Sequence, residues 1–119
     1  MSTDPYNARV RELFAAPEHA GDLAGGATVL ADDQGVRVVI SASVADGRIA
    51  ALRFRAWGCP HLIAAVEWVC SHYEGELLQA LEKFPVARIM EDLAVPIEKT
   101  GRILVVEDAV QSLGRSLNH

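Results

Sequence analysis

The chain has 119 residues, 50% of them hydrophobic, and 16 acidic against 11 basic side chains give it a net charge of -5 at pH 7. This length suffices for one compact core and not for two, so we expect a single domain over residues 1–119. The basic residues are scattered, which argues against nucleic acid as a partner, and no apolar run approaches the roughly 18 residues of a membrane span. Because residues 1–5 also lack the features of a signal peptide, we expect a cytoplasmic protein without membrane association.

The N-terminal part predicts one short helix and one irregular connection. Val10, Leu13 and Phe14 recur at helical spacing, which indicates an amphipathic helix over residues 7–15 that covers a sheet edge or a groove. The glycine-containing segment 17–26 completes no nucleotide-binding motif, so we expect a loop there.

The middle of the chain predicts three strands. Residues 27–30 form a candidate first strand, which a polar turn over residues 31–35 ends. In residues 36–44 the even-numbered positions are apolar, the pattern of a strand buried on one face. Asp46-Gly47 is a favoured hairpin dipeptide, and residues 48–57 are expected to return antiparallel.

Cys59 stands where the last strand meets a predicted helix over residues 60–73. Gly58 lets the backbone turn closely and Pro60 suits the first turn of a helix, so Cys59 is expected to be the N-cap. There the helix dipole and the free backbone N–H groups stabilise a thiolate, which predicts a reactive sulfur or a metal ligand. A small, buried and inert cysteine is the alternative that the position alone leaves open.

Other residues of the same helix bear on this site. His61, in the first turn, is close enough to Cys59 to be a metal ligand or a neighbouring polar group, although an ordinary exposed histidine is the commoner situation. Cys70 lies roughly 16 Å along the helix from Cys59, too far for a disulfide or a shared ion, and is assigned to the core. Ala64 and Glu67 are predicted to face solvent.

The C-terminal third predicts three helices. Two short ones, over residues 76–84 and 86–93, are split by Pro85, and an exposed extended linker follows over residues 95–101. The last helix is expected from about residue 104 to residue 117.

Several blocks of the chain share the order and spacing of a known family. They are Tyr6-Asn7, Pro17-Glu18-His19-Ala20-Gly21, Arg53-Phe54 through Trp57-Gly58-Cys59, Leu93-Ala94-Val95-Pro96 and Val106-Glu107-Asp108-Ala109-Val110. Together they resemble the iron–sulfur cluster scaffold proteins of the IscU and NifU N-terminal type. The resemblance implies an α/β chain of the α+β type, in which helices pack on one face of a small antiparallel three-stranded sheet, and the strand-then-helix order agrees with it.

The resemblance also implies a site, which this chain keeps only in part. The family holds its cluster with three cysteines and an aspartate, and Cys59 matches the central cysteine. Asp33 and Arg102 stand at the other two cysteine positions, and Gly35 stands at that of the aspartate. One soft ligand remains, and Arg102 would repel a cation. We therefore predict Cys59, Asp33 and His61 as the metal-site residues of a divergent member that holds an iron–sulfur cluster, iron or zinc weakly or not at all.

The resemblance implies a scaffold or carrier in iron–sulfur cluster assembly, rather than an enzyme, with a cysteine desulfurase or another assembly protein as partner. Three hypotheses follow. The chain passes on iron, sulfide or a cluster through Cys59, as a monomer or as a homodimer that supplies a second thiolate. Alternatively, Cys59 accepts persulfide sulfur as a nucleophile. In the third hypothesis the chain is a docking or regulatory protein that keeps the fold without the cluster; the family's chaperone-binding motif is reduced here to Val95-Pro96-Ile97-Glu98-Lys99.

Overall fold

The chain folds into one sheet and the helices that cover it. The computed structural model describes residues 6–117, so the expectation about a signal peptide, which rests on residues 1–5, lies outside it. In chain order the elements are α1 (Ala8–Ala15), β1 (Ala27–Asp33), β2 (Val36–Ala45), β3 (Arg48–Trp57), α2 (Pro60–Tyr73), the 3-10 helix η1 (Leu78–Glu82), α3 (Val86–Asp92), the 3-10 helix η2 (Ile97–Lys99) and α4 (Thr100–Leu117).

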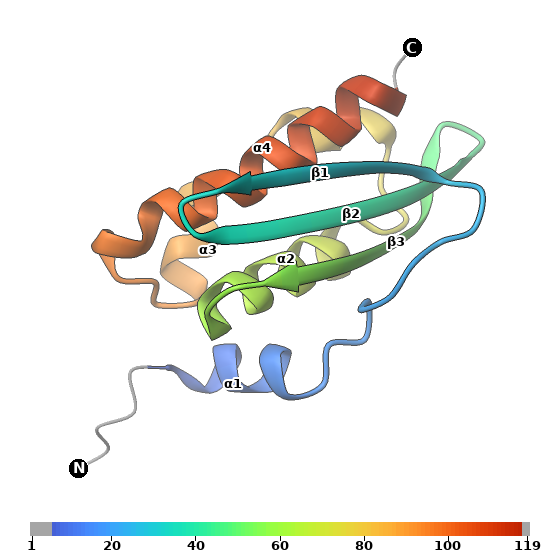
Figure 1. Cartoon of the computed structure of the whole chain (residues 1–119). Helices are drawn as coiled ribbons and strands as arrows, with labels where there is room; N and C mark the ends of the chain where they lie inside the picture. Colours follow the sequence, from blue (N-terminus) through green and yellow to red (C-terminus); the bar gives the residue numbers. More distant parts are fainter. Residues whose placement is uncertain (1–5, 118–119) are drawn as a thin grey trace.

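The strands pair antiparallel in the order β1-β2-β3, and the helices lie on one face of the sheet (Figure 1). α4 packs on β1 and β2, and α2 packs on β3. The sequence predicted that α1 covers a sheet edge or a groove; its main partner is α2, and its Phe14 lines a groove. The predicted α+β arrangement is confirmed. Among the described helices, none is both long and apolar enough to cross a membrane.

β1 is longer than expected because the turn after it is tighter. The register pairs Asp33 with Val36, so only Gln34 and Gly35 form the turn. Both have positive φ, 54° and 74°, as a two-residue turn that follows the strand twist requires. Ala31, which was predicted to lie in the turn, is a buried strand residue.

A β-bulge changes the predicted faces at the start of β3. The register shifts between Ser43 and Val44, which pair with Ala51 and Ile49. The extra residue on β3 exchanges the two faces of that strand beyond the bulge. Ile49 therefore shares the core face with Leu52 and is fully buried. Val44, its partner near the end of β2, was predicted to be buried and is 40% exposed.

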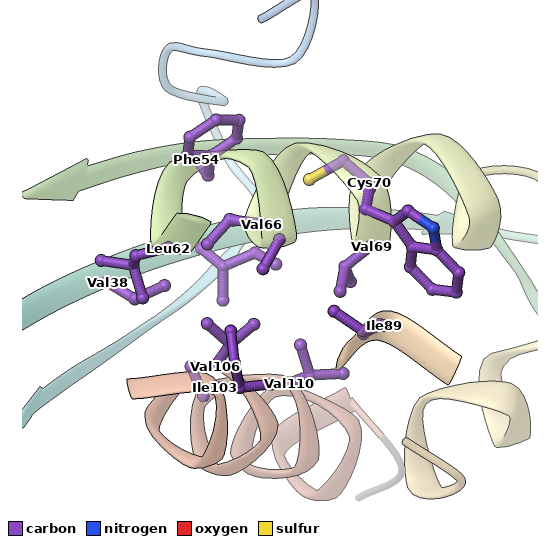
Figure 2. Packing of buried hydrophobic residues seen from close by; sticks show 14 of the residues in the cluster. Val38, Phe54, Leu62, Val66, Val69, Cys70, Ile89, Ile103, Val106 and Val110 are labelled. Carbon is purple, nitrogen blue, oxygen red and sulfur yellow. The ribbon is translucent and has the colours of Figure 1, made fainter. Parts of the chain in front are cut away.

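α2 is buried on almost every side. Figure 2 shows Val66 and Val69 of this helix pointing toward α4, the helix that carries Val106. Of the residues predicted to face solvent, Ala64 and Glu67 are 0% and 2% exposed, so that prediction is wrong for them, whereas Ser71 is exposed and Glu74 half-buried. The reason is that α1 packs on α2 in addition to the sheet and α4, so no broad polar face remains.

The buried carboxylate of Glu67 ties the loop after α1 to α2. It accepts hydrogen bonds from the backbone N–H of His19 at 2.8 Å and from the Ser71 hydroxyl at 2.9 Å, and it also pairs with His19 Nδ1. The carbonyl of His19 accepts the N–H of Phe54 at 2.9 Å, and Gly21 donates to the Phe54 carbonyl at 2.8 Å. The loop is irregular, as expected, but it adds a short row of strand-like bonds to the edge of β3.

The C-terminal helices differ from expectation at their ends. Of the segment 76–84 only η1 is helical, whereas α3 follows its predicted range closely. The predicted extended linker contains η2, and α4 begins directly after it at Thr100. Arg102 therefore lies in the first turn of α4.

Replacing Glu67 by Gln is expected to destabilise the protein by about 1–3 kcal/mol. The change removes the negative charge, and the amide NH₂ of Gln replaces one of the two oxygens that accept the His19 N–H and the Ser71 hydroxyl. Urea unfolding followed by circular dichroism measures the loss. Glu91→Gln, a change of an exposed carboxylate on α3, is the control. Equal unfolding midpoints for the two variants would contradict the role assigned to Glu67.

Candidate functional site

The corner between β3 and α2 lies very close to the start of β2. A Cβ atom at Gly58 would stand 2.6 Å from Leu62 Cδ2 and 2.8 Å from Val36 Cγ1, and both distances are too short. Gly58 does not have the positive φ that often requires a glycine. The requirement for glycine here comes from the lack of space for a Cβ atom. Pro60 follows in the first turn of α2. These neighbours fix the backbone of Cys59 between them.

Cys59 is the N-cap of α2, as predicted, with φ of -79° and ψ of 164°. Its carbonyl accepts the N–H groups of Leu62 at 3.0 Å and Ile63 at 3.2 Å. Its side chain makes no capping hydrogen bond of regular geometry, although the Leu62 N–H lies near enough to the sulfur to act on its charge. The thiol is partly exposed and free of any disulfide.

The surroundings of this sulfur favour the thiolate. Burial raises the pKa of the Cys59 thiol, but the Leu62 backbone N–H, the Arg102 guanidinium and the Lys99 ammonium together hold that pKa below its ordinary value. The two cations come from η2 and from the first turn of α4. Cys70, by contrast, is fully buried, and burial raises the pKa of its thiol strongly.

His61 is buried, not exposed, with 1% of its surface accessible. Its ring lies 4.7 Å from that of Tyr6, and Lys99 Nζ lies 3.2 Å from its Nδ1. Burial first, and then the charges of Lys99 and Arg102, lower the pKa of His61, so the ring is neutral. Because an ammonium only donates, Nδ1 accepts and the proton is on Nε2. That nitrogen is buried without a hydrogen-bond partner among residues 6–117.

Asp33, the third predicted ligand, lies at the β1–β2 turn. Its carboxylate accepts the backbone N–H of Gln34 at 2.8 Å, and Gln34 lies close to Gly101 at the start of α4. No described hydrogen bond or ion pair joins Asp33 to Cys59 or His61. Within residues 6–117 no group of three or more His, Cys, Asp or Glu side chains is placed to hold a metal ion. The three-residue metal site therefore stays a prediction.

Lys99 is the site residue that sequence reasoning missed. It was placed in an exposed linker, whereas it contacts both His61 and the ring of Tyr6, whose centroid lies 5.4 Å from Nζ. A signal was available in the spacing of Lys99 and Arg102, three residues apart at a helix start. Cations are disfavoured there by the helix dipole, so a pair of them indicates a nearby anionic partner.

The fold and this corner define a class of protein, a small α+β domain that presents one cysteine at the start of its central helix. The profile of the family described as the NifU-like N terminal domain matches residues 5–113. The match spans most of the chain, and the chain belongs to this family.

Solved structures agree with this family. The chain is similar to the N-terminal part of a nitrogen-fixing NifU-like protein from Brucella abortus, with a TM-score of 0.76, 18% identity and coverage of 94% of this chain and 93% of that one. It is also similar to a "Putative iron-sulfur cluster assembly scaffold protein for SUF system" from Fervidobacterium islandicum AW-1, with a TM-score of 0.75, 13% identity and coverage of 91% and 95%. At these identities the likeness concerns the fold. A comparison with curated proteins found no match.

Cys59 is expected to react with iodoacetamide at pH 7 far faster than Cys70, because its surroundings lower the pKa of its thiol and leave it accessible, whereas Cys70 is buried and its pKa is raised. In the double variant Lys99→Ala/Arg102→Ala the pKa of Cys59 should rise, so alkylation at neutral pH should slow by up to about tenfold per pKa unit. Mass spectrometry of each thiol across pH measures both effects, and Arg115→Ala, an exposed change on α4, is the control. Faster reaction of Cys70, or an unchanged pH profile in the double variant, would refute this assignment.

Proposed function

We propose that the chain serves iron–sulfur cluster assembly by accepting sulfur as a persulfide on Cys59. The observation that carries the proposal is the convergence of Lys99 and Arg102 on a single cysteine at a helix start. A persulfide on Cys59 ionises as a thiol does. The charges of Lys99 and Arg102 and the dipole of α2 stabilise the anion of either group. The surroundings thus suit a sulfur anion both before and after transfer.

The same surroundings do not suit an iron–sulfur cluster. Protein-bound clusters are held by several soft ligands, as a rule four cysteine thiolates. Cys59 supplies one, and Lys99 occupies Nδ1 of His61. Iron at this place would also stand beside two cations, and within residues 6–117 no group of three or more His, Cys, Asp or Glu side chains is placed to offset them. In this proposal the predicted ligands Asp33 and His61 therefore hold no cluster, and iron or zinc binds weakly.

Membership of the NifU-like family supports the assembly role, as does the likeness to a structure whose name describes a scaffold for that process. The partner in the proposal is a cysteine desulfurase, which supplies persulfide sulfur. The reaction belongs to the cytoplasm in this reading and needs one copy of the chain, since one cysteine is sufficient for it.

The transfer is a thiol–persulfide exchange. The thiolate of Cys59 attacks the outer sulfur of a donor R–S–SH, a bond forms between the two sulfurs, and the S–S bond of the donor breaks. The donor leaves as the thiolate R–S⁻, and Cys59 carries the persulfide S–SH. No electron is gained or lost overall. Because Lys99 and Arg102 favour the thiolate of Cys59, this proposal assigns no general base.

Incubation with a cysteine desulfurase and radiolabelled cysteine should place sulfur on Cys59 in a form that dithiothreitol releases. Cys59→Ser should abolish the label, and Cys70→Ala, the control at the buried thiol, should keep it. Lys99→Ala/Arg102→Ala should slow labelling at pH 7 by up to about tenfold per unit of pKa. Label on Cys70, or none on the parent chain, would refute the proposal and favour the docking role.

The parent chain is expected to retain no stoichiometric cluster after anaerobic incubation with iron, sulfide and a desulfurase. The triple variant Asp33→Cys, Gly35→Asp and Arg102→Cys should bind zinc at least about tenfold more tightly, because three or four ligands close a coordination sphere that one cannot. Competition with a chelator measures the affinity. Gly35 has φ of 74°, so circular dichroism must first show that the variant is folded. Equal affinities in a folded variant would mean that these positions do not converge on Cys59.

A further inference from the structure

The outer edge of β3 is covered along most of its length and open at one position. Alternate residues of an antiparallel edge strand turn their N–H and C=O groups away from the neighbouring strand. On this edge Glu74 Oε2 accepts the N–H of Leu52 at 2.8 Å, and the loop at residues 19–21 bonds both groups of Phe54. The next residue in the row is Ala56. Within residues 6–117 no group bonds its outward N–H and C=O.

Ala56 faces a groove of about 520 Å³ between α1, the loop after it, β3 and α2. Its apolar walls are formed by Phe14, Pro17, Gly21, Phe54, Trp57 and Ile63. Two of them are large side chains left open to solvent, since Phe14 is 43% and Trp57 is 52% exposed. The charged residue on the rim, Arg55, is ion-paired with Asp22 at 2.6 Å. The groove therefore offers an apolar surface and two backbone bonds.

This combination suits an extended polypeptide segment. Proteins protect the edges of their sheets from pairing with other chains, as this protein does with its own loop up to Gly21 (Figure 1). Where the loop turns away, the unprotected position adjoins the groove. A guest strand gains main-chain bonds from such an edge and places alternate side chains in the adjoining pocket.

One wall of the groove stands near Cys59. Ile63, which lines the groove, follows Cys59 by about one helical turn, and its N–H donates to the Cys59 carbonyl at 3.2 Å. Beside Cys59, Lys99 and Arg102 provide positive charge. A segment that carries an anionic sulfur would thus find apolar contacts along the groove and a complementary charge beyond it.

We infer that an extended segment of the sulfur-donating protein adds to β3 at Ala56, lies in this groove and carries its persulfide to Cys59. The inference rests on the sulfur transfer proposed above and adds where the donor docks. The segment places an apolar side chain among Phe14, Phe54 and Ile63. Its backbone donates to the carbonyl of Ala56 and accepts its N–H.

The test uses the full chain, a cysteine desulfurase as the protein donor and glutathione persulfide as a small donor that needs no docking. Phe14→Glu and Trp57→Glu place a charge in the groove from two different elements. Leu77→Glu is the matched control, since Leu77 is 49% exposed and lies near Arg48, at the other end of β3. Binding of the desulfurase is measured by calorimetry in a Cys59→Ser background, where no transfer can follow.

Both groove variants should weaken desulfurase binding at least about tenfold and slow transfer from it, because a buried charge costs more than 1.4 kcal/mol. Transfer from glutathione persulfide should be unchanged, and Leu77→Glu should change neither quantity. Undiminished binding in folded groove variants would overturn the inference. If the parent accepts sulfur from neither donor while the groove variants still weaken binding, the proposed sulfur transfer fails and the docking surface stands.

Amide hydrogen exchange tests the strand addition separately. Exchange of the Ala56 N–H should slow at least about tenfold in the complex with the desulfurase, because this group then donates to the guest segment. The N–H of Phe54, which already donates to His19, is the internal reference. An Ala56 amide that exchanges at the same rate in the complex and in the free chain would overturn the inference.

Discussion

The site depends on the close approach of the β3–α2 corner to the start of β2. Only a residue without a Cβ atom can stand at Gly58, between Val36 and Leu62. This approach seats the first turn of α2 on the sheet, and α1 and α4 then enclose the rest of the helix. Because Cys59 is the N-cap of a helix buried on almost every side, its backbone cannot move without disturbing the core. Packing, not a set of ligands, therefore fixes the point from which the sulfur projects.

The sequence predicted the elements well where hydrophobic period and turn chemistry agreed. The turn at Asp46-Gly47 and the helix over residues 60–73 stand where they were expected, and the family resemblance supplied the correct layers. Burial was harder to predict because it depends on contacts between distant elements. Glu67 has the sequence pattern of a solvent-facing residue, yet α1 covers it and His19 satisfies its carboxylate. Ile49 is buried although it is out of step with Leu52 and Phe54, because the bulge inserts an extra residue between them in β3.

In the candidate site, too, the local features were predicted from the sequence and the contacts between distant elements were not. Gly58 and Pro60 sufficed to predict Cys59 as an N-cap, because capping is a local property of the chain. The burial of His61 and its contact with Lys99 join α2 to η2, 38 residues apart, and no local pattern announces such a pair. The family resemblance did point to Arg102, but only as the residue that replaces a cysteine ligand. In the structure, the Arg102 guanidinium helps to lower the pKa of the Cys59 thiol.

Two cations at the start of α4 are an electrostatic cost unless an anion accompanies them, since the helix dipole already makes that end positive. A thiolate or persulfide at Cys59 offsets Lys99 and Arg102, whereas an iron ion would add to the repulsion. The fold does not oppose such an exchange of chemistry, because ligand positions at the ends of strands and helices contribute little to the core. Asp33 sits in an exposed hairpin end and Arg102 in the first turn of a helix, while the buried side chains that stabilise the domain lie elsewhere. In the proposed function, the residues that set the chemistry at Cys59 and the buried residues that stabilise the domain are therefore separate sets, so the charge around the sulfur can change without a change of fold.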